Sequence, residues 1–263
     1  MSVTPSITDT HAHLFWASFD ADREEVIARA RERGVDRFVV VGTDVATSQA
    51  AFALCAGRAG FFPTAGIHPH DATASDAAAR AVIRELCARP ECVAVGETGL
   101  DWFKEYSPRA DQLDNFRWHA ELARELDKPL VVHSRDAHAD TVEVLRSAPG
   151  ARGVMHCYSM GPDELPPYLE LGFYISFSGM VTYPKNTTNR AAAEQVPLER
   201  IVFETDCPYL APQKKRGTRN EPGNVRDVLE QVAQWRGMEV LELARISSAN
   251  ATHLFGLKPS NGA

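Results

Sequence analysis

The chain has 263 residues and a formal net charge of −7. This charge argues against extensive, sequence-independent wrapping of a polyanion, because such binding needs many Lys and Arg contacts to phosphates. The composition, 44% hydrophobic and 24% charged, is ordinary for a globular protein and excludes broad disorder. No run of about 18 apolar residues and no export signal is recognisable. The five cysteines form no CxxC pair, so we predict reduced core thiols in a cytoplasmic protein.

Short segments rich in β-forming residues recur along the chain, and segments with helical periodicity separate them. The predicted strands cover residues 6–14, 37–43, 61–69, 92–100, 129–135, 153–159, 173–179 and 201–208. Among the intervening segments, 20–34 and 109–129 are amphipathic. The apolar stripe of the second consists of Leu113, Phe116, Ala120, Ala123 and Leu126, at helical spacing.

This alternation predicts parallel βα units that close into one TIM (β/α)8 barrel domain over residues 1–263. An open doubly wound sheet is the alternative. No GxGxxG segment follows the first strand, and polar residues end strands all along the chain, which favours the barrel. The tail 238–257 predicts one more helix, packed outside the barrel or across its bottom.

Polar residues at the carboxyl ends of the predicted strands are the candidate functional groups, because barrel chemistry collects there. His11 and His13 end the first strand and alternate onto one face. Later strands end in His68, Glu97, His133, His156 and Asp206. Any one of the histidines fits an ordinary hydrogen-bonded core residue. Together they would be costly to bury unpaired, at several kcal/mol each, so we predict a metal site.

Four imidazoles and two carboxylates are too many for one catalytic zinc, which takes about three protein ligands. They suit two divalent ions about 3.5–4 Å apart that share a carboxylate. We assign His11, His13 and Asp206 to one ion, and His133 and His156 to the other. Glu97 is the predicted bridge. Imidazole-rich ligation favours zinc or manganese, with magnesium possible.

Other residues near these positions receive structural assignments. Strand alternation predicts that Cys157 and Cys207 point away from the metals, toward the helices. Glu204 shares the face of Asp206 and is expected to orient a ligand. The histidines in helical segments, His119, His138 and His253, are expected to be structural or solvent-facing.

Several longer segments add a resemblance. DTHAHL, GIHPH, GETGLDW, HSRDA, HCYS, SFSGMVTY, ETDCPYLAP and RGTRNEP follow one another between residues 8 and 222, and NATHLFGL lies near the C-terminus. This set resembles the signature blocks of the TatD family of metal-dependent deoxyribonucleases. The resemblance implies an amidohydrolase-type TIM barrel that hydrolyses DNA, often as a 3′–5′ exonuclease. It implies the same six metal ligands, a further active-site histidine at His68 and a basic substrate loop over 216–222.

The chain departs from the family pattern at three positions that are not proposed ligands. Phe15 stands where an acidic residue is usual, Met160 where glycine is usual, and Thr218 where lysine is usual. The absent lysine bears on substrate preference, because it would lie beside the metals and favour polynucleotide binding.

The predicted reaction is attack of a metal-activated water on a phosphodiester. Asp206 is the candidate general base, and Glu97 holds the metals. His68, Arg216 and Arg219 would hold the scissile phosphate of DNA or another phosphodiester. The alternatives are an amidohydrolase or lactonase acting on a small carbonyl substrate, and a noncatalytic metal-binding protein. The basic cluster of Lys214, Lys215, Arg216 and Arg219 suits phosphate binding, and a solvated loop is the alternative interpretation of this cluster.

Overall fold

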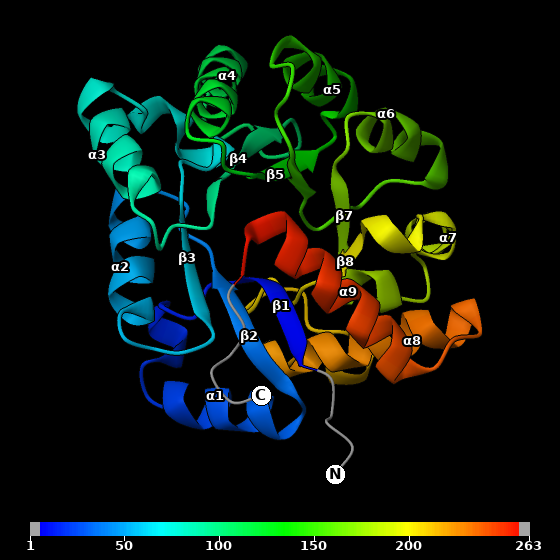
Figure 1. Cartoon of the computed structure of the whole chain (residues 1–263). Coiled ribbons are helices and arrows are strands. Elements are labelled where there is room, and N and C mark those ends of the chain that lie inside the picture. The colour runs from blue at the N-terminus through cyan, green and yellow to red at the C-terminus, as the bar shows by residue number, and fades with distance from the viewer. Residues whose placement is uncertain (1–5, 258–263) are drawn as a thin grey trace.

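Eight parallel strands form a barrel in the computed structural model, which describes residues 6–257. The strands are β1 (Ile7–Ala12), β2 (Val35–Val40), β3 (Phe61–Ala65), β4 (Ala94–Asp101), β5 (Leu130–Arg135), β6 (Gly153–Met155), β7 (Tyr174–Phe177) and β8 (Ile201–Phe203). Each pairs with the next in sequence, and a parallel bridge between Ala12 and Cys207 joins the last segment to the first. The predicted TIM barrel is confirmed, and Figure 1 shows the helices arranged around it.

Helices follow the strands and cover the outside of the barrel. They are α1 (Arg23–Glu32), α2 (Val45–Cys55), α3 (Ala77–Ala88), α4 (Arg109–Glu125), α5 (His138–Ser147), α6 (Leu165–Glu170), α7 (Thr187–Gln195) and α8 (Val225–Arg236). Short 3₁₀ turns occupy Ala17–Phe19, Pro69–Ala74, Pro162–Glu164, Gly179–Thr182, Leu198–Arg200, Gln213–Lys215 and Pro222–Asn224. Within the described residues 6–257, no helix is both long and apolar enough to cross a membrane.

The α4 helix shows how the apolar periodicity positions its neighbours. Phe116, Ala120 and Ala123 are buried against the barrel, and the outer members of the predicted stripe are partly buried. His119 lies on the same helix. Its Nε2 accepts a hydrogen bond from the Ile67 amide at 3.1 Å, and its Nδ1 donates to the Asn115 carbonyl at 2.8 Å. Burial lowers its pKa to about 4, so His119 is a neutral core histidine.

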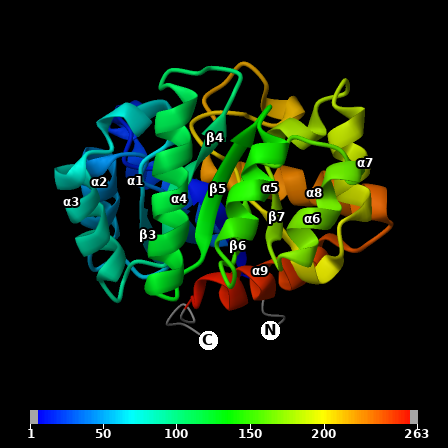
Figure 2. The same cartoon turned by 90° about the horizontal axis from the view of Figure 1, so that it is seen from above.

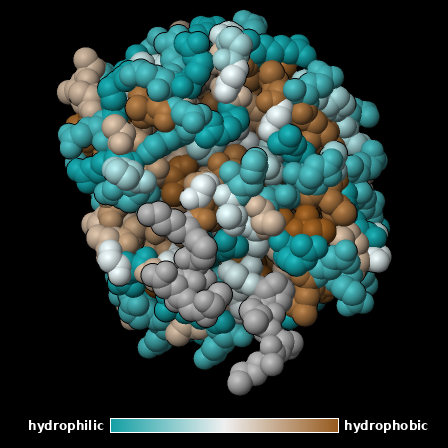
Figure 3. Space-filling model, viewed as in Figure 1, coloured by the Kyte–Doolittle hydropathy of each residue, from teal (hydrophilic) through white to brown (hydrophobic). Residues whose placement is uncertain are grey.

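A final helix, α9 (Val240–Phe255), lies beneath the barrel and covers the amino-terminal ends of the strands (Figures 1 and 2). Its residues Ala251, Leu254 and Phe255 pack with strand residues including Val39 and Val131 in one apolar cluster. The predicted tail helix is therefore present and closes the bottom. On the face seen in Figure 3, hydrophilic side chains predominate between smaller hydrophobic patches. Because α9 closes the bottom, the barrel interior is accessible from the carboxyl ends of the strands.

All eight observed strands are shorter than predicted, and several of them end before the candidate site residues. His13, His156 and Asp206 follow β1, β6 and β8 rather than lying within them. Asp206 has a φ of 56° and Cys157 a φ of 45°, a left-handed conformation that ends extended structure. The functional segments therefore leave the strand geometry where they reach the barrel mouth.

Candidate metal centre

The first group of predicted ligands converges at the carboxyl ends of β1 and β8. His11 Nε2 lies 3.2 Å from His13 Nε2. Asp206 Oδ1 lies 3.3 Å from His13 Nε2 and 3.7 Å from His11 Nε2. These three side chains therefore present their donor atoms to one point, as predicted for the first ion.

A second group gathers around Glu97 on β4. Glu97 Oε1 lies 3.2 Å from His133 Nδ1, 3.1 Å from His156 Nε2 and 3.3 Å from His68 Nε2. The other oxygen, Oε2, lies 3.3 Å from His11 Nε2. Glu97 thus offers one oxygen to each group, which is the arrangement that a bridging carboxylate requires.

The spacing of these donors fits divalent cations. With metal–ligand bonds of 2.0–2.1 Å, two ligands of a tetrahedral ion lie about 3.3 Å apart. The separations of 3.1–3.7 Å between the donor atoms bracket this value. Three sets of three donors, drawn from these residues, each lie within 4.8 Å of one another.

Hydrogen bonds on the far side of each ring decide which nitrogen can bind a metal. His13 Nδ1 donates to the Val41 carbonyl at 2.8 Å, and His156 Nδ1 donates to Glu204 Oε1 at 3.0 Å. His133 Nε2 donates to Asp101 Oδ2 at 3.2 Å. In each case the proton is fixed away from the centre, and the nitrogen facing the centre keeps its lone pair. Three predicted ligand histidines are therefore oriented as ligands.

His68 has the opposite arrangement. Its Nδ1 accepts a hydrogen bond from the His70 amide at 3.1 Å, so the neutral ring carries its proton on Nε2. Burial lowers the pKa of His68 to about 4, which keeps the ring neutral near pH 7. The nitrogen that faces Glu97 is therefore an N–H donor and not a free lone pair. His68 is suited to hold an oxygen of the substrate, the role predicted for it, rather than a metal.

The charges within the centre are set by burial and mutual attraction. Burial raises the pKa of Glu97, but the neighbouring histidines outweigh it and hold this pKa well below its usual range. Burial lowers the pKa of His156, but Glu204 and Glu97 raise it well above the ordinary value. A metal ligand must be a neutral imidazole, so metal binding here has to release protons.

Two supporting acids lie behind the ligands. Glu204, expected to orient a ligand, is buried and accepts hydrogen bonds from His156 Nδ1 and, at 2.8 Å, from the Cys157 amide. Asp101 holds His133 and also accepts from His70 Nε2 at 2.8 Å. Sequence reasoning missed Asp101 and His70. Asp101 immediately follows the predicted strand 92–100, so the rule that singled out the other strand-end residues could have found it.

Close backbone packing explains a glycine in the same segment. Gly99 lies between Glu97 and Asp101 with a φ of 137°, which disfavours any residue with a Cβ. A Cβ there would also come within 1.9 Å of the His133 carbonyl oxygen. Glycine thus lets β4 and β5 bring Glu97 and Asp101 to His133.

A cavity of about 870 Å³ opens above the centre. Its lining includes predicted residues from both groups, among them His13, His68, Glu97, His133, His156 and Asp206. It also includes two cations, Lys104 and Arg135, and the aromatic residues Trp16, Tyr106 and Tyr209, none of which was a predicted site residue. Two further acids, Asp71 and Asp136, also line it. The cavity therefore combines metal-ligand chemistry with side chains of both charges and exposed rings.

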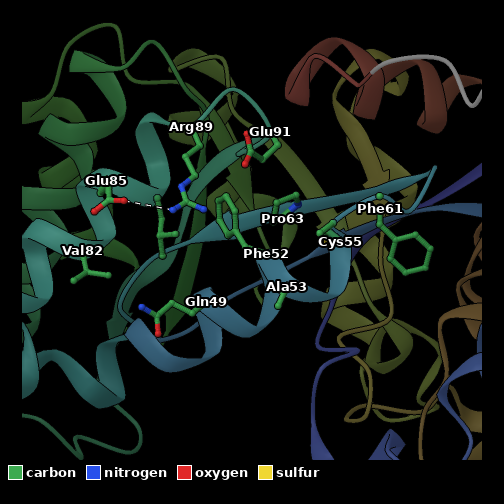
Figure 4. Close-up of a pocket in the computed structure, with 13 residues that line it drawn as sticks. Gln49, Phe52, Ala53, Cys55, Phe61, Pro63, Val82, Glu85, Arg89 and Glu91 are labelled. Atoms are coloured by element: carbon green, nitrogen blue, oxygen red, sulfur yellow. Dashed lines mark hydrogen bonds and ion pairs between the residues drawn. The ribbon is translucent and has the colours of Figure 1, made fainter.

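A second cavity, of about 640 Å³, lies between α2 and α3 on the side of the barrel (Figure 4). Phe52 forms part of its wall, with the Arg89 guanidinium 5.5 Å from the ring centre. Arg89 also pairs with Glu85 at 3.4 Å. None of the predicted metal ligands lines this cavity, so the functional site is the cavity at the strand ends.

The prediction for Cys157 is wrong. Because β6 ends at Met155 and Cys157 adopts a positive φ, strand alternation no longer determines its direction. Its side chain lines the cavity, with Sγ 3.1 Å from Ser178 Oγ, and burial raises the pKa of the thiol. Cys207 is fully buried in the core, as predicted.

Arg219 of the predicted basic loop lies away from the cavity and has partners of its own. Arg219 is absent from the cavity lining, and its guanidinium pairs with Asp22 at 2.6 Å and Glu221 at 3.3 Å. It also donates to the Ser18 carbonyl and lies 4.6 Å from the ring centre of Phe19. These partners attach the loop to the start of α1. The structure therefore supports a structural role for Arg219, and its substrate contact stays a prediction.

Arg219→Ala is expected to lower the free energy of unfolding by about 1–2 kcal/mol, since it removes two half-exposed ion pairs and a cation–π contact. The KM for an oligonucleotide is expected to stay within about twofold. Denaturant unfolding and steady-state kinetics measure the two effects.

The matched control is Arg216→Ala on the same loop. Arg216 is likewise absent from the cavity lining, and its guanidinium lies 4.5 Å from the ring centre of Tyr183. Its substrate contact stays a prediction, and its loss should affect stability less. A large rise in KM for Arg219→Ala with unchanged stability would instead support substrate binding by Arg219.

The fold and the site together define a metal-dependent hydrolase built on a TIM barrel. The family model described as "TatD related DNase" matches residues 8–256. The chain belongs to this family.

Its relatives cover nearly the whole chain. It is 39% identical to "Uncharacterized metal-dependent hydrolase YabD" of Bacillus subtilis over 94% of this chain and 98% of that protein. It is 35% identical to "3'-5' ssDNA/RNA exonuclease TatD" of Shigella flexneri over 95% and 98%, respectively. Among solved structures, the TatD homologue YJJV of Escherichia coli matches with a TM-score of 0.92 at 25% identity, over 97% of this chain and 100% of that chain.

Proposed function

We propose that this hydrolase cleaves phosphodiester bonds at the 3′ end of DNA strands, using two divalent ions with zinc or manganese favoured. The observation that carries the proposal is the set of ring orientations. His13 turns a lone pair toward His11 and Asp206, and His133 and His156 turn theirs toward Glu97, whereas His68 turns an N–H toward Glu97. The rings with inward lone pairs provide ligands, and His68 provides a hydrogen-bond donor for a substrate oxygen.

The metal ligands in this proposal are His11, His13 and Asp206 for one ion, and His133 and His156 for the other, with Glu97 between them. Bound divalent ions supply Lewis acidity and a water of lowered pKa. The family name and the name of the exonuclease relative support a nucleic-acid substrate.

Asp206 is the proposed general base. Burial raises its pKa, but the hydrogen bond from His13 and the nearby histidine charges lower it below the ordinary value, so the carboxylate is ionised near neutral pH. Its side chain lines the cavity and can accept a proton from the attacking water.

Three groups are placed to hold the phosphate. His68 Nε2–H donates to a phosphate oxygen without adding charge. Lys104 and Arg135 line the same cavity and offset the negative charge of the diester. A neutral amide or lactone would gain little from two such cations, which favours the phosphodiester over the carbonyl substrates.

The test is digestion by metal-reconstituted protein of 5′-labelled and 3′-labelled DNA, single-stranded and duplex, beside RNA, bis-p-nitrophenyl phosphate and a lactone. We expect 5′-labelled single-stranded DNA to shorten in a ladder from its 3′ end. Glu97→Ala serves as the inactive control. Turnover of the lactone alone would replace this proposal with the carbonyl hydrolase.

A further inference from the structure

Exposed aromatic side chains are concentrated at the mouth of the metal cavity. The large hydrophobic residues that are exposed within the described part of the chain are Trp16, Phe103, Tyr106, Tyr209 and Leu241. Three of these five line the cavity, and Phe103 contacts the two lining cations, Lys104 at 5.6 Å and Arg135 at 3.9 Å from its ring centre. Solvent-exposed apolar surface gathered at one place marks a binding site.

The rings stand on two sides of the centre. Trp16 lies 6.3 Å from the ring centre of His13, and Tyr209 lies 6.5 Å from Trp16, beside the first group of ligands. Tyr106 lies 4.8 Å from the ring of His70, which is hydrogen-bonded through Asp101 to the second group. We call Trp16, Tyr209 and Tyr106 the aromatic rim.

Positive charge accompanies the rim on the Tyr106 side. Lys104 Nζ lies 5.7 Å from the Tyr106 ring centre, and Arg135 packs on Phe103. Aromatic faces beside cations are the surface that single-stranded nucleic acid uses, because its bases stack on rings while its phosphates meet cations. A duplex end keeps its bases stacked on one another and cannot offer both faces to the rim.

We infer that the aromatic rim binds unpaired bases on the two sides of the scissile phosphate, one against Trp16 and Tyr209 and the other against Tyr106. Since every base has an aromatic face, this binding does not depend on the base sequence. This inference rests on the proposed phosphodiesterase function and adds to it the residues that bind the bases.

Binding of a fluorescein-labelled single-stranded hexadeoxynucleotide, followed by fluorescence anisotropy, tests the rim. The protein is the manganese-loaded Asp206→Asn variant, which keeps the oligonucleotide intact during the measurement. The comparison strand has abasic sites in its last two positions. Because one stacked base contributes about 5- to 150-fold in affinity, the intact strand is expected to bind at least about tenfold more tightly.

Substitutions that each remove one aromatic ring identify the residues that bind the bases. Trp16→Ala and Tyr106→Ala are each expected to weaken binding of the intact strand by at least about fivefold and to leave the abasic strand within about twofold. Trp16→Phe should keep most of the affinity, and Leu241→Ala, which removes an exposed hydrophobic residue on α9, should change nothing. Equal affinity for intact and abasic strands, or equal losses on both strands, would overturn the inference.

Hydrolysis of bis-p-nitrophenyl phosphate by the unmodified protein is measured in parallel. Turnover of this small ester with no base-dependent binding means that the rim assignment fails while the proposed function stands. Base-dependent binding without turnover of any phosphodiester means that the proposed function fails while the rim binds nucleic acid.

Discussion

Asp206→Asn is expected to lower kcat for phosphodiester hydrolysis by about 10²–10⁴-fold, the range for loss of a general base. The amide keeps the size of the carboxylate and one oxygen for His13, but it cannot accept a proton from water. Because that oxygen remains, part of the metal affinity should remain. Steady-state kinetics and the metal content of the dialysed protein measure the two quantities separately.

Asp136→Asn is the matched control for this substitution. Asp136 lines the same cavity and has a φ of 54°, close to the 56° of Asp206, and asparagine tolerates this left-handed conformation. Its kcat should stay within about threefold of the unmodified protein. If Asp206→Asn retained nearly full turnover, another group would have to act as the base.

At the proposed two-ion site, Glu97→Gln is expected to reduce the number of bound ions from two to one or fewer and to lower kcat by about 10³-fold or more. The side chain keeps its volume but loses the charge and one of the two oxygens that face His11 and His133. Equilibrium dialysis with metal analysis gives the stoichiometry, and circular dichroism checks that the variant is folded.

Glu204→Gln is expected to have an intermediate effect. Glu204 accepts a hydrogen bond from His156 Nδ1, on the side of the ring that faces away from the proposed ions. Loss of such a supporting contact costs about 10- to 100-fold in metal affinity or activity. Glu204→Gln should therefore lie between the unmodified protein and Glu97→Gln. Two fully bound ions in Glu97→Gln would contradict the bridging assignment.

Most of the confirmed predictions came from two patterns. One is hydrophobic periodicity, and the other is the occurrence of polar residues at the carboxyl ends of the strands. All eight strands, the α4 stripe and the tail helix could be recognised because burial leaves a regular apolar pattern. The convergence of His11, His13 and Asp206 followed from topology, since parallel strands in a barrel place their carboxyl ends at one mouth.

The sequence could not predict features that depend on local backbone conformation or on charge pairing between distant residues. The direction of Cys157 depends on a positive φ that no alternation pattern contains. Arg219 is paired with Asp22, which lies far away in the sequence, so the basic cluster alone could not reveal this ion pair. The rim residues Trp16 and Tyr209 are likewise isolated aromatics whose proximity exists only in the folded barrel.

The ligands proposed for the first ion come from segments at the first and the last strand of the barrel, and main-chain hydrogen bonds hold these segments together. The Asp206 amide donates to the His11 carbonyl and the His13 amide donates to the Cys207 carbonyl, each at 2.9 Å. A nascent polypeptide that has not yet reached β8 has neither these bonds nor Asp206. Under the proposed ligand assignment, hydrolytic activity therefore arises only after synthesis has passed the final strand.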